Sequence, residues 1–460
     1  LFYIIKRHIS ISLIQCKCLK YMKEGAYMSN INYIRNILNL KDKNIIFKEN
    51  YYKEEIINGI THKIFEGYLS YKPKYCPKCG ILFDERFEKH GFITSDIKIP
   101  KVSGFKSILR LHKQRYLCKH CYKAFTLTSD ITDFGCFISN NTKYSITIDL
   151  TKKRSEKDIA IDNNVSHNTI EQVMDSYYNL DKAFKNYLPN VLLFDEFKSV
   201  KSADGHMSFH LCDGLTGQTI DIVEDRKLLS LIRYFGRYSH NAIKRVKYIV
   251  IDMYSPYISL IKNIFPNALI IIDTFHIIQL ISRALNKTRI MIMKKDKVNY
   301  NKLKRYWRLL LKSRDELNYE KWKKYACFNK FITKSDVVNY IINTNIELKN
   351  TYDVYQNLLS SIKNKNYNLF IHILDNHSDN ISSYMKTSIK TLNEFKDKIK
   401  NTFNNNYHNG YIEGNNNFIK VIKRIAFGFR SFIRFKTRIL ICKNLLKINK
   451  KRTTDPPLFA

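Results

Sequence analysis

The chain has few of the residues that interrupt folded structure and few acidic residues. Its 460 residues include 14 Gly and 8 Pro, which excludes collagen-like, mucin-like and linker-rich chains. It also lacks any uncharged run of about 18 apolar residues, so the sequence predicts no membrane-spanning helix. Only 41 Asp and Glu stand against 78 Lys and Arg, a formal net charge of +37. Such an excess indicates a polyanionic partner, either nucleic acid or an anionic membrane surface.

Apolar residues are plentiful enough for packed cores. The sequence is 44% hydrophobic and 13% aromatic, which excludes wholesale disorder. At roughly 150 residues per domain, the chain should hold two to four domains. The first apolar stretch is broken by Lys6, Arg7 and His8 and has no clear cleavage site, so it is a poor signal peptide. Met28 opens an amphipathic segment that looks like a natural start. We therefore expect residues 1–27 to be a non-native or disordered leader.

We further expect an N-terminal helical lead-in at residues 28–70 and a loose tail at residues 447–460.

Four of the ten cysteines have the spacing of metal ligands. Cys76 and Cys79 form one C-x-x-C pair, and Cys118 and Cys121 form another, with 38 residues between the two pairs. Two such pairs supply four thiolates in a tetrahedron, which suits structural Zn²⁺. Because the interval is longer than usual, we expect an extra hairpin inside a zinc ribbon at residues 71–130. The alternatives are a thioredoxin-like redox pair or buried thiols without a ligand.

Residues 155–178 have the pattern of a helix-turn-helix, within an expected DNA-binding domain at residues 145–188. Ser166 is a good N-cap for the second helix, and Asn163 and Asn164 can form the turn. The apolar residues of the two helices should pack together: Ile159, Ala160, Ile170, Val173 and Met174. If the second helix enters a major groove, the side chains that reach base edges are His167, Asn168, Thr169 and Gln172. The alternative is an ordinary helical hairpin.

Strand patterns dominate the next part of the chain. Short apolar or β-branched runs lie at residues 191–197, 207–213, 219–223, 246–252 and 269–273. The first three resemble a meander and helical patterns separate the rest, so the sequence predicts a mixed α/β sheet. From about residue 280 to 405 the apolar spacing is helical and strand signals nearly vanish. From residue 407 onward we expect one long basic amphipathic helical region.

Three carboxylates stand where separate elements can bring them together. Asp195 lies inside the first strand, Asp252 ends the fourth, and Glu413 opens the last helix. Converging carboxylates repel one another unless cations hold them, and two Mg²⁺ ions there would support in-line phosphoryl transfer. Each residue alone has a plainer explanation, because Asp is common at strand ends and Glu favours a helix N-terminus.

These segments resemble the ISL3 family of insertion-sequence transposases. LLFDEFKSVK is similar to the family's first-aspartate strand, and VIDMYSPYISLIKNI followed by FPNALIIIDTFHIIQ is similar to its second-aspartate region. HNGYIEGNNNFIKVIKRIAFGFRSFIRFKTRIL is similar to its third-acid region. CPKCG and YLCKHC, followed by a helix-turn-helix, match its N-terminal arrangement. The resemblance covers residues 28–450, and Thr274 stands where the family often has Arg.

The resemblance implies a multidomain chain of the α+β and α/β classes. After the zinc ribbon and helix-turn-helix, an RNase H-like catalytic core would comprise residues 189–280 and 406–446. An α-helical insertion domain would interrupt it at residues 281–405. The resemblance also implies a DDE enzyme that uses two Mg²⁺ (or Mn²⁺) ions and the catalytic, metal-binding acids Asp195, Asp252 and Glu413.

Asp273 and His276 match a D-x-x-H element of related DDE enzymes. We expect this pair to orient the metal ligands or to position DNA rather than to hold the metals directly. The alternative makes Asp273 the second metal acid. Asp252 is preferred because it ends the strand that should neighbour the first one.

The sequence is thus interpreted as a transposase that binds terminal inverted repeats and catalyses DNA cleavage and strand transfer. Its partners would be the DNA of the terminal repeats and of the target. The protein would act as a homodimer or a higher oligomer. We expect neither a membrane partner nor a small-molecule substrate. The expected location is the bacterial cytoplasm, at the nucleoid. Basic residues of the last helical region would contact phosphates: Lys420, Lys423, Arg424 and Arg430. The alternatives are a non-catalytic DNA-binding regulator and an RNase H-like nuclease without strand transfer.

Overall fold

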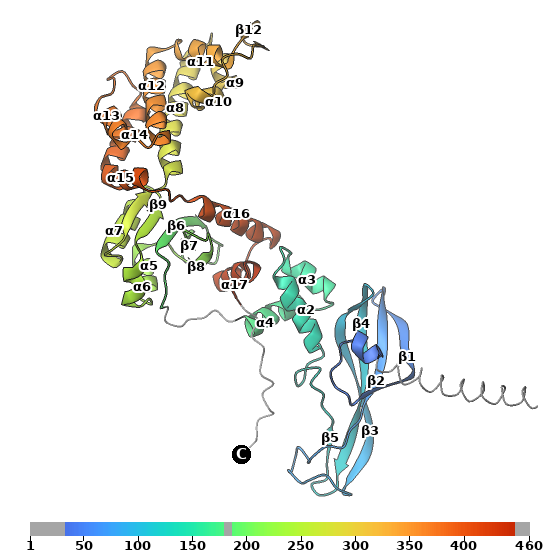
Figure 1. Ribbon diagram of the computed structural model, residues 1–460. Coiled ribbons are helices and arrows are strands. Elements are labelled where there is room, and N and C mark those ends of the chain that lie inside the picture. The colour runs from blue at the N-terminus through green and yellow to red at the C-terminus, as the bar shows by residue number, and fades with distance from the viewer. Residues whose placement is uncertain (1–32, 179–185, 447–460) are drawn as a thin grey trace, which may run out of the picture. The chain divides into compact units, whose positions relative to one another are not determined.

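The computed structural model describes residues 33–178 and 186–446 in two compact units (Figure 1). One unit comprises Leu1–Leu180 and Thr437–Ala460, and the other comprises Asp181–Lys436. The leader expected at 1–27 and the tail expected at 447–460 lie outside the described residues. Among the helices of the described part, none combines the length and the low charge that a membrane span requires.

A five-stranded sheet opens the first unit. Its strands are β1 (Ile45–Ile57), β2 (Ile60–Leu69), β3 (Phe87–Val102), β4 (Phe105–Cys118) and β5 (Lys123–Thr126). The order is β1-β2-β4-β3, with β5 beside β4; β2 and β4 are parallel and the other pairs are antiparallel. The long β3–β4 hairpin fills the interval between the two cysteine pairs (Figure 1). The sequence-based expectation of an extra hairpin there is confirmed.

The helical lead-in expected at residues 28–70 is wrong for most of its length. Residues 33–37 are helical, but residues 45–69 form the β1–β2 hairpin. Its turn is Asn58–Gly59, with φ of 51° and 73°, the left-handed conformation that two-residue hairpin turns require. Within β1, Ile45 and Phe47 are the buried residues. The strand therefore lacks the alternating apolar pattern by which a half-buried strand is usually found.

Three helices follow the sheet: α2 (Asn140–Leu150), α3 (Glu156–Asp162) and α4 (His167–Tyr177). The Ser166 hydroxyl accepts the Thr169 N–H at the start of α4, and Asn164 has φ of 54° in the turn before it. The predicted inner residues form one buried cluster, together with Ile441 of α17 (Phe432–Cys442): Ile159, Ala160, Ile170, Val173 and Met174. The helices, the cap and the inner face of the helix-turn-helix are confirmed.

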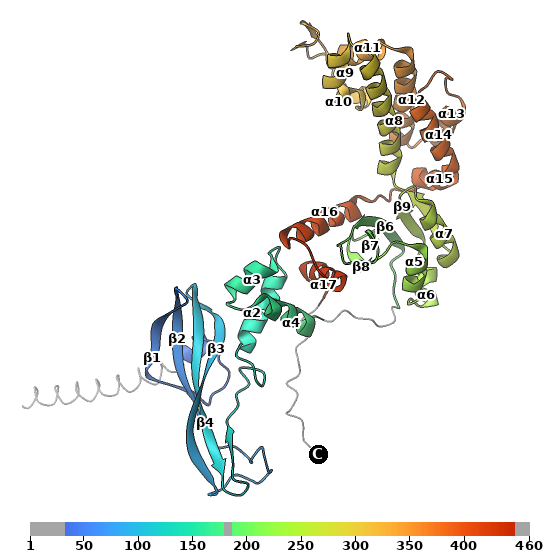
Figure 2. The ribbon, with the colours of Figure 1, turned by 180° about the vertical axis from the view of Figure 1, so that it is seen from behind.

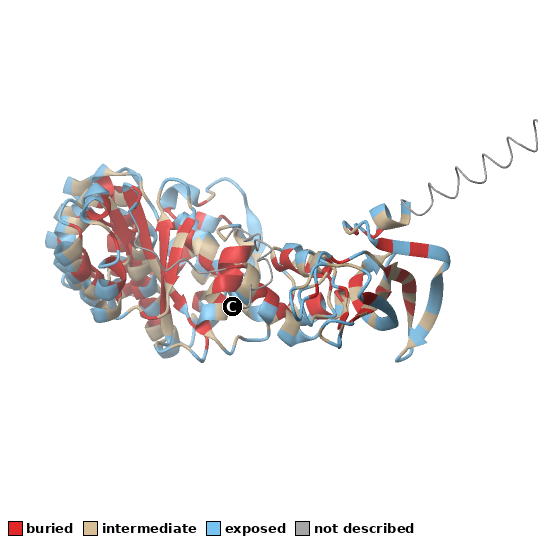
Figure 3. Ribbon diagram, turned by 90° about the horizontal axis from the view of Figure 1, so that it is seen from below, coloured by how far each residue is buried: buried red, intermediate tan, exposed pale blue. Residues whose placement is uncertain are grey.

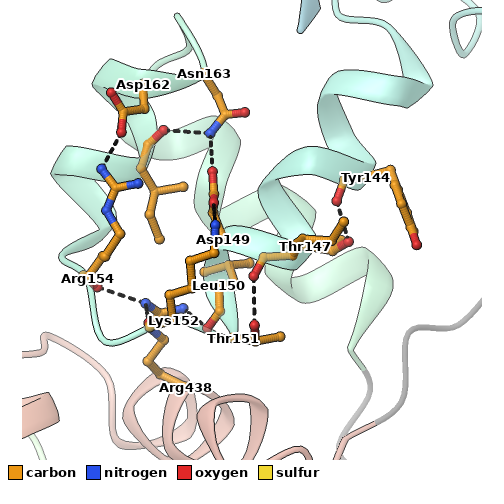
Figure 4. Close-up of polar contacts among 12 residues, drawn as sticks. Tyr144, Thr147, Asp149, Leu150, Thr151, Lys152, Arg154, Asp162, Asn163 and Arg438 are labelled. Atoms are coloured by element: carbon orange, nitrogen blue, oxygen red, sulfur yellow. Dashed lines mark hydrogen bonds and ion pairs between the residues drawn. The ribbon is translucent and has the colours of Figure 1, made fainter. Parts of the chain in front are cut away.

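Arg438 of α17 is buried against the same helices (Figure 4). Its guanidinium donates to the backbone oxygens of Leu150, Lys152 and Arg154, where α2 ends and leaves carbonyls without helical partners. This arginine therefore stabilises the helix-turn-helix from within the protein.

The second unit is built on a five-stranded mixed sheet (Figure 2). Its strands are β6 (Val191–Lys198), β7 (Met207–Asp213), β8 (Thr219–Val223), β9 (Tyr248–Ile251) and β10 (Leu269–Ile272), in the order β10-β9-β6-β7-β8. The central strand β6 pairs antiparallel with β7, and β7 pairs antiparallel with β8. On the other side of β6, the strands β9 and β10 run parallel to it. All five predicted strands are present, and the order agrees with the RNase H-like core that the resemblance implies.

Alternate residues of β6 face the two sides of this sheet. Phe194 packs with the cluster covered by α5 (Leu228–Phe235), α6 (His240–Arg245) and α7 (Ser255–Ile264). Leu193 packs on the opposite side with Ile412 of α16 (Gly410–Ile425). The sheet is thus buried on both faces. Figure 3 colours the buried residues of the molecule red.

The expected insertion domain is a helical bundle with one small sheet. It consists of α8 (Thr274–Lys295), α9 (Tyr300–Arg305), α10 (Trp307–Leu310), the 3-10 turn Arg314–Glu316, β11 (Lys323–Tyr325), β12 (Lys330–Ile332), α11 (Lys334–Ile342), α12 (Ile346–Lys363), α13 (Tyr367–Asp375), α14 (Ser383–Glu394) and α15 (Lys396–Asn404). The β11–β12 hairpin was not expected. Helix α8 begins directly after β10, so the boundary expected at residue 280 falls inside one continuous helix. Thr402 of α15 exchanges hydrogen bonds with Ile272 and covers the β10 edge.

The last helical region is two helices, α16 and α17, rather than one. Between them Phe427 and Gly428 have φ of 53° and 113°, and such left-handed residues end an α-helix. The amphipathic character is as expected for α16, since Ile412, Ile419 and Ile422 are buried on one face.

Candidate metal centre and DNA interface

Two of the three predicted acids lie at equivalent positions beside neighbouring strands. Strands β6 and β9 pair in parallel with Leu193 opposite Val250, and Asp195 and Asp252 each lie two residues further along. The carboxyl ends of parallel strands meet at the same edge of a sheet. Both acids accordingly line one pocket of about 300 Å³, together with His276, Tyr254 and Arg283.

The third acid gathers with the D-x-x-H pair. One ligand atom each of Asp273, His276 and Glu413 lies within 4.8 Å of the others. His276 Nε2 is 2.7 Å from Asp252 Oδ1 and 3.9 Å from Asp273 Oδ2. His276 therefore stands between the strand-end acid and the cluster that contains Glu413.

Asp273 holds the segment that presents Glu413. It is buried, and its Oδ1 accepts the Asn409 N–H at 3.2 Å. Asn409 in turn begins α16 and accepts the Glu413 N–H at 3.0 Å. Asp273 thus fixes the start of the helix that bears the third acid.

The centre carries carboxylates that are difficult to keep ionised. Burial raises the pKa of Asp195 to about 7, and the nearby charge of Asp252 acts in the same direction. Burial also raises the pKa of Asp273. Burial would lower the pKa of His276, but its contact with Asp252 and the charge of Asp273 raise it instead. The site therefore favours added positive charge.

The donor atoms suit a divalent cation. Asp252 Oδ1 is shielded from solvent and makes no well-aligned hydrogen bond, although His276 Nε2 is close to it. A buried carboxylate oxygen in this state costs free energy unless something positive binds it. Carboxylate oxygens are the ligands that Mg²⁺ and Mn²⁺ prefer. The residues present thus fit the cations that the acid pattern predicts.

Sequence reasoning missed Asn416, which contacts one of the acids, and His210, which contacts Asn416. Asn416 Nδ2 donates to Asp195 Oδ2 at 2.7 Å, and His210 Nδ1 lies 2.7 Å from Asn416 Oδ1. Asn416 is the second of three consecutive asparagines, so the sequence gives no reason to prefer it over its neighbours. The 3.6-residue period from the buried Ile412 and Ile419 is the signal that places it on the inner face.

The four cysteines of the two C-x-x-C pairs converge as predicted. Cys76 and Cys121 sulfurs are 3.9 Å apart, as are those of Cys79 and Cys118. Zn–S bonds of about 2.3 Å in a tetrahedron would separate the sulfurs by about 3.8 Å. Burial would raise the pKa of Cys118, but the backbone N–H groups of Cys121 and His120 lower it to about 7. The Ile81 backbone would lower the pKa of Cys79, but burial and the three neighbouring sulfurs raise it to about 12. It is therefore the geometry of the four sulfurs that fits structural zinc.

The predicted base-reading side chains lie at the start of α4. His167, Asn168 and Gln172 are exposed, whereas Thr169 is half-buried and its hydroxyl lies 3.0 Å from that of Ser166. His167 also lies 3.3 Å from a Glu156 oxygen, so its ring is oriented by an acidic neighbour.

The predicted phosphate contacts divide into two groups. Lys420, Arg424 and Arg430 are exposed. Lys423 is half-buried, and its ammonium donates to the backbone oxygens of Lys198 and Ser199 at 3.0 and 2.5 Å. The surface role expected of Lys423 is therefore not supported, because two of its three donors tie α16 to the end of β6.

Comparisons with known proteins agree with this architecture. A family described as "Transposase", of the ISL3 type with DDE acids, matches residues 192–439. A second, described as "zinc-finger of transposase IS204/IS1001/IS1096/IS1165", matches residues 72–121. One curated protein, named "ATP-dependent protease" from Lactococcus lactis subsp. lactis, is 38% identical over 110 residues, covering 24% of this chain. The chain spans about a third of that protein's length, 35%. Since the first match covers more than half of the residues and includes all the clustered acids, the chain belongs to the ISL3 family of DDE transposases.

Proposed function

We propose that the protein binds the terminal inverted repeats of an insertion sequence and catalyses metal-dependent DNA cleavage and strand transfer. The observation that carries the proposal is the meeting of Asp195 and Asp252 at one sheet edge, with Glu413 linked to them through His276. Family membership supports a DNA-processing enzyme, and the oxygen-rich centre supports phosphoryl transfer.

In this proposal the acids hold and orient the reacting groups. Two bound Mg²⁺ (or Mn²⁺) ions would activate the attacking oxygen and stabilise the leaving oxygen. Asp195, Asp252 and Glu413 would provide the carboxylates for them, and Asp273 would keep α16 in place. His276 would fix the orientation of Asp252 and balance its charge. The exposed Lys420, Arg424 and Arg430 would seat phosphates through sequence-independent contacts.

Recognition of the ends would lie in the first unit. The zinc ribbon, held by its four cysteines, and the exposed start of α4 would read the terminal repeat. Because transposition requires two ends held together, we propose that the active form is a dimer or a higher oligomer.

The test is to change each acid separately in the full-length protein. Asp195→Asn, Asp252→Asn and Glu413→Gln should each reduce cleavage and joining of repeat-end DNA at least 10³-fold, because the cations need those charges. Binding to the repeat, measured without divalent cations, should stay within about twofold. Asp375→Asn, at the end of α13 in the helical bundle, is the matched control and should leave the rates unchanged.

The same assays separate this function from its alternatives. A nuclease without strand transfer would cut repeat ends but would not join pre-cleaved ends to a target plasmid. If any one of the three variants retained strand transfer near the wild-type rate, that residue would not be catalytic.

A further inference from the structure

A buried polar chain runs from β8 through β7 to the first catalytic acid. Thr219 Oγ1 lies 3.0 Å from His210 Nε2, and His210 Nδ1 lies 2.7 Å from Asn416 Oδ1. Asn416 Nδ2 then donates to Asp195 Oδ2 at 2.7 Å. His210 is 0% exposed and Asn416 is 5% exposed, so water does not compete for these bonds.

This hydrogen-bonded chain joins the neighbouring strands β6, β7 and β8 to α16, which lies about 200 residues further along the sequence. His210 and Asp195 are directly opposite each other in the β7–β6 pairing, so their side chains share one face of the sheet. Asn416 comes from the buried face of α16, just under one turn after Glu413. One asparagine thus spans the strand of the first acid and the helix of the third.

With Asp195 ionised and the His210 ring neutral, the atoms of this hydrogen-bonded chain fix which group donates to the carboxylate. Asp195 accepts at both oxygens, since its Oδ1 also accepts the Glu196 N–H at 2.7 Å. The group of Asn416 that faces the carboxylate is therefore its NH₂, which leaves its oxygen for His210. His210 then carries its proton on Nδ1, and its Nε2 accepts from the Thr219 hydroxyl at 3.0 Å or from the Cys212 thiol at 3.3 Å. Each bond fixes the orientation of the next group.

A neutral donor is the appropriate partner for an acid that binds cations. A lysine or arginine in the place of Asn416 would neutralise Asp195 and compete with a metal ion for it. The asparagine fixes the rotation of the carboxylate but leaves its charge intact. His210 contacts the amide oxygen of Asn416 and so fixes the orientation of the amide. The Asp195 carboxylate is therefore held in one position before a cation arrives.

We propose that Asn416 is a positioning residue, with its amide oriented by His210. It holds the Asp195 carboxylate in the orientation that binds a divalent cation, and it does so from the same helix that bears Glu413. The inference rests on the proposed function, because it assigns a role to Asn416 in the same metal centre. Asn416 touches a metal-binding acid through its amide, and His210 acts through Asn416.

The test measures Mn²⁺ binding to the full-length, zinc-loaded protein by calorimetry, independently of DNA cleavage. Asn416→Leu removes the donor with little change in volume, and Asn417→Leu is the matched control. Asn417 lies on the same helix but is exposed, and its Oδ1 accepts a hydrogen bond from Lys420 Nζ. Asn415 is not used as the control, because it donates to Cys212 Sγ, which lies 3.3 Å from His210 Nε2. Removing a residue that orients a metal ligand weakens binding by 10- to 100-fold in other sites. We therefore expect Asn416→Leu to raise the Mn²⁺ dissociation constant about tenfold and Asn417→Leu to change it less than twofold.

A second pair of variants tests the same link without altering α16. His210→Leu should weaken Mn²⁺ binding in the same direction as Asn416→Leu. His210→Asn should restore much of the affinity, because its amide NH₂ can replace the Nδ1 donor. Thermal melting and repeat-end binding report folding for every variant. If Asn416→Leu proves unfolded, the comparison of His210→Leu with His210→Asn decides the question.

Asp195→Asn separates failure of this inference from failure of the proposed function. If Asp195→Asn loses Mn²⁺ binding but Asn416→Leu and His210→Leu bind it as the wild type does, the positioning role is wrong and the metal centre stands. If Asp195→Asn itself binds Mn²⁺ normally, the metal centre on which both depend is wrong. An equal loss of Mn²⁺ affinity in Asn417→Leu and Asn416→Leu would show a general effect of loosening α16, and would overturn the specific role of Asn416.

Discussion

His276 Nε2 lies 2.7 Å from Asp252 Oδ1, although the two residues come from α8 and from the loop after β9. The contact is made because β9 and β10 pair in parallel, with Ile251 opposite Ile272, so that the residues following both strands are neighbours. The first turn of α8 then directs an imidazole back toward the acid at the end of the adjacent strand.

We predict that His276→Gln slows DNA cleavage by about 10- to 100-fold while repeat-end binding is unchanged. A residue that orients a metal-binding carboxylate typically has an effect of this size. Single-turnover cleavage at several Mg²⁺ concentrations measures it. His240→Gln, an exposed histidine at the start of α6, serves as the control. A His276→Gln variant with the wild-type rate would show that the contact with Asp252 has no part in catalysis.

Asp195 should make the metal-free core less stable as the pH rises. Its pKa is about 7 in the folded protein because of burial, against about 3.9 in an unfolded chain. Folding therefore favours the protonated form. Its contribution is fully present below about pH 4 and is lost as the pH rises to about 7.

Asp195→Asn should accordingly stabilise the metal-free protein by about 4 kcal/mol at pH 8 and by almost nothing at pH 4. Urea unfolding at the two pH values, with divalent cations removed, measures the difference. Saturating Mg²⁺ should reduce the difference at pH 8, since the cation stabilises the wild-type carboxylate. Equal stabilisation at both pH values would contradict the explanation.

Removal of zinc should unfold the zinc ribbon without unfolding the second unit. The four sulfurs are positioned for one ion, and metal binding supplies part of the folding free energy of such a module. Cys118→Ser should release zinc and weaken repeat-end binding. Metal analysis and far-UV circular dichroism provide the measurements, with Cys327→Ser as the control. Freshly purified wild-type protein without zinc would argue against the site.

Base reading and phosphate contact should be separable by salt titration. Gln172→Ala should reduce the preference for the terminal repeat, because a lost base contact costs about 1–3 kcal/mol. Arg424→Ala should weaken binding to all DNA and reduce the salt dependence by about one counterion. Lys423→Ala should affect the salt dependence less, since its ammonium is bonded to Lys198 and Ser199. If Gln172→Ala lowered the affinity for repeat and scrambled duplexes equally, α4 would not read the DNA sequence.

Arg438→Leu should destabilise the first unit by about 2–4 kcal/mol, because three backbone oxygens would lose their donor inside the protein. Figure 4 shows the guanidinium at the end of α2, where these oxygens gather. Denaturant unfolding followed with a probe in α2–α4 measures the effect. Arg430→Leu, at an exposed position, should change stability by less than about 0.5 kcal/mol. Similar values for the two variants would contradict the structural role of Arg438.

The local patterns of the sequence determined the strands, the helix-turn-helix and the cysteine knuckles. The five runs around Asp195 and Asp252 are short and mostly apolar or β-branched, which is typical of strands in a sheet that helices cover. Ser166 and Asn164 mark the start of α4 by chemistry that acts over a few residues. The hairpin at 45–69 was missed because β1 is largely exposed and has no alternating pattern, even though Asn58–Gly59 is a strong turn signal.

Tertiary structure alone decided which polar side chains meet. Asp195 and Asn416 are 221 residues apart, and their contact depends on how α16 packs on the sheet. The same packing withdraws Lys423 from the surface, and a buried position for Arg438 follows from the carbonyls left free at the end of α2. The composition and spacing of the sequence are equally compatible with a charged or amide residue that is exposed and with one that is buried. The partner that a buried polar group finds is set by the fold, because burial without a partner costs too much free energy for the native state to tolerate.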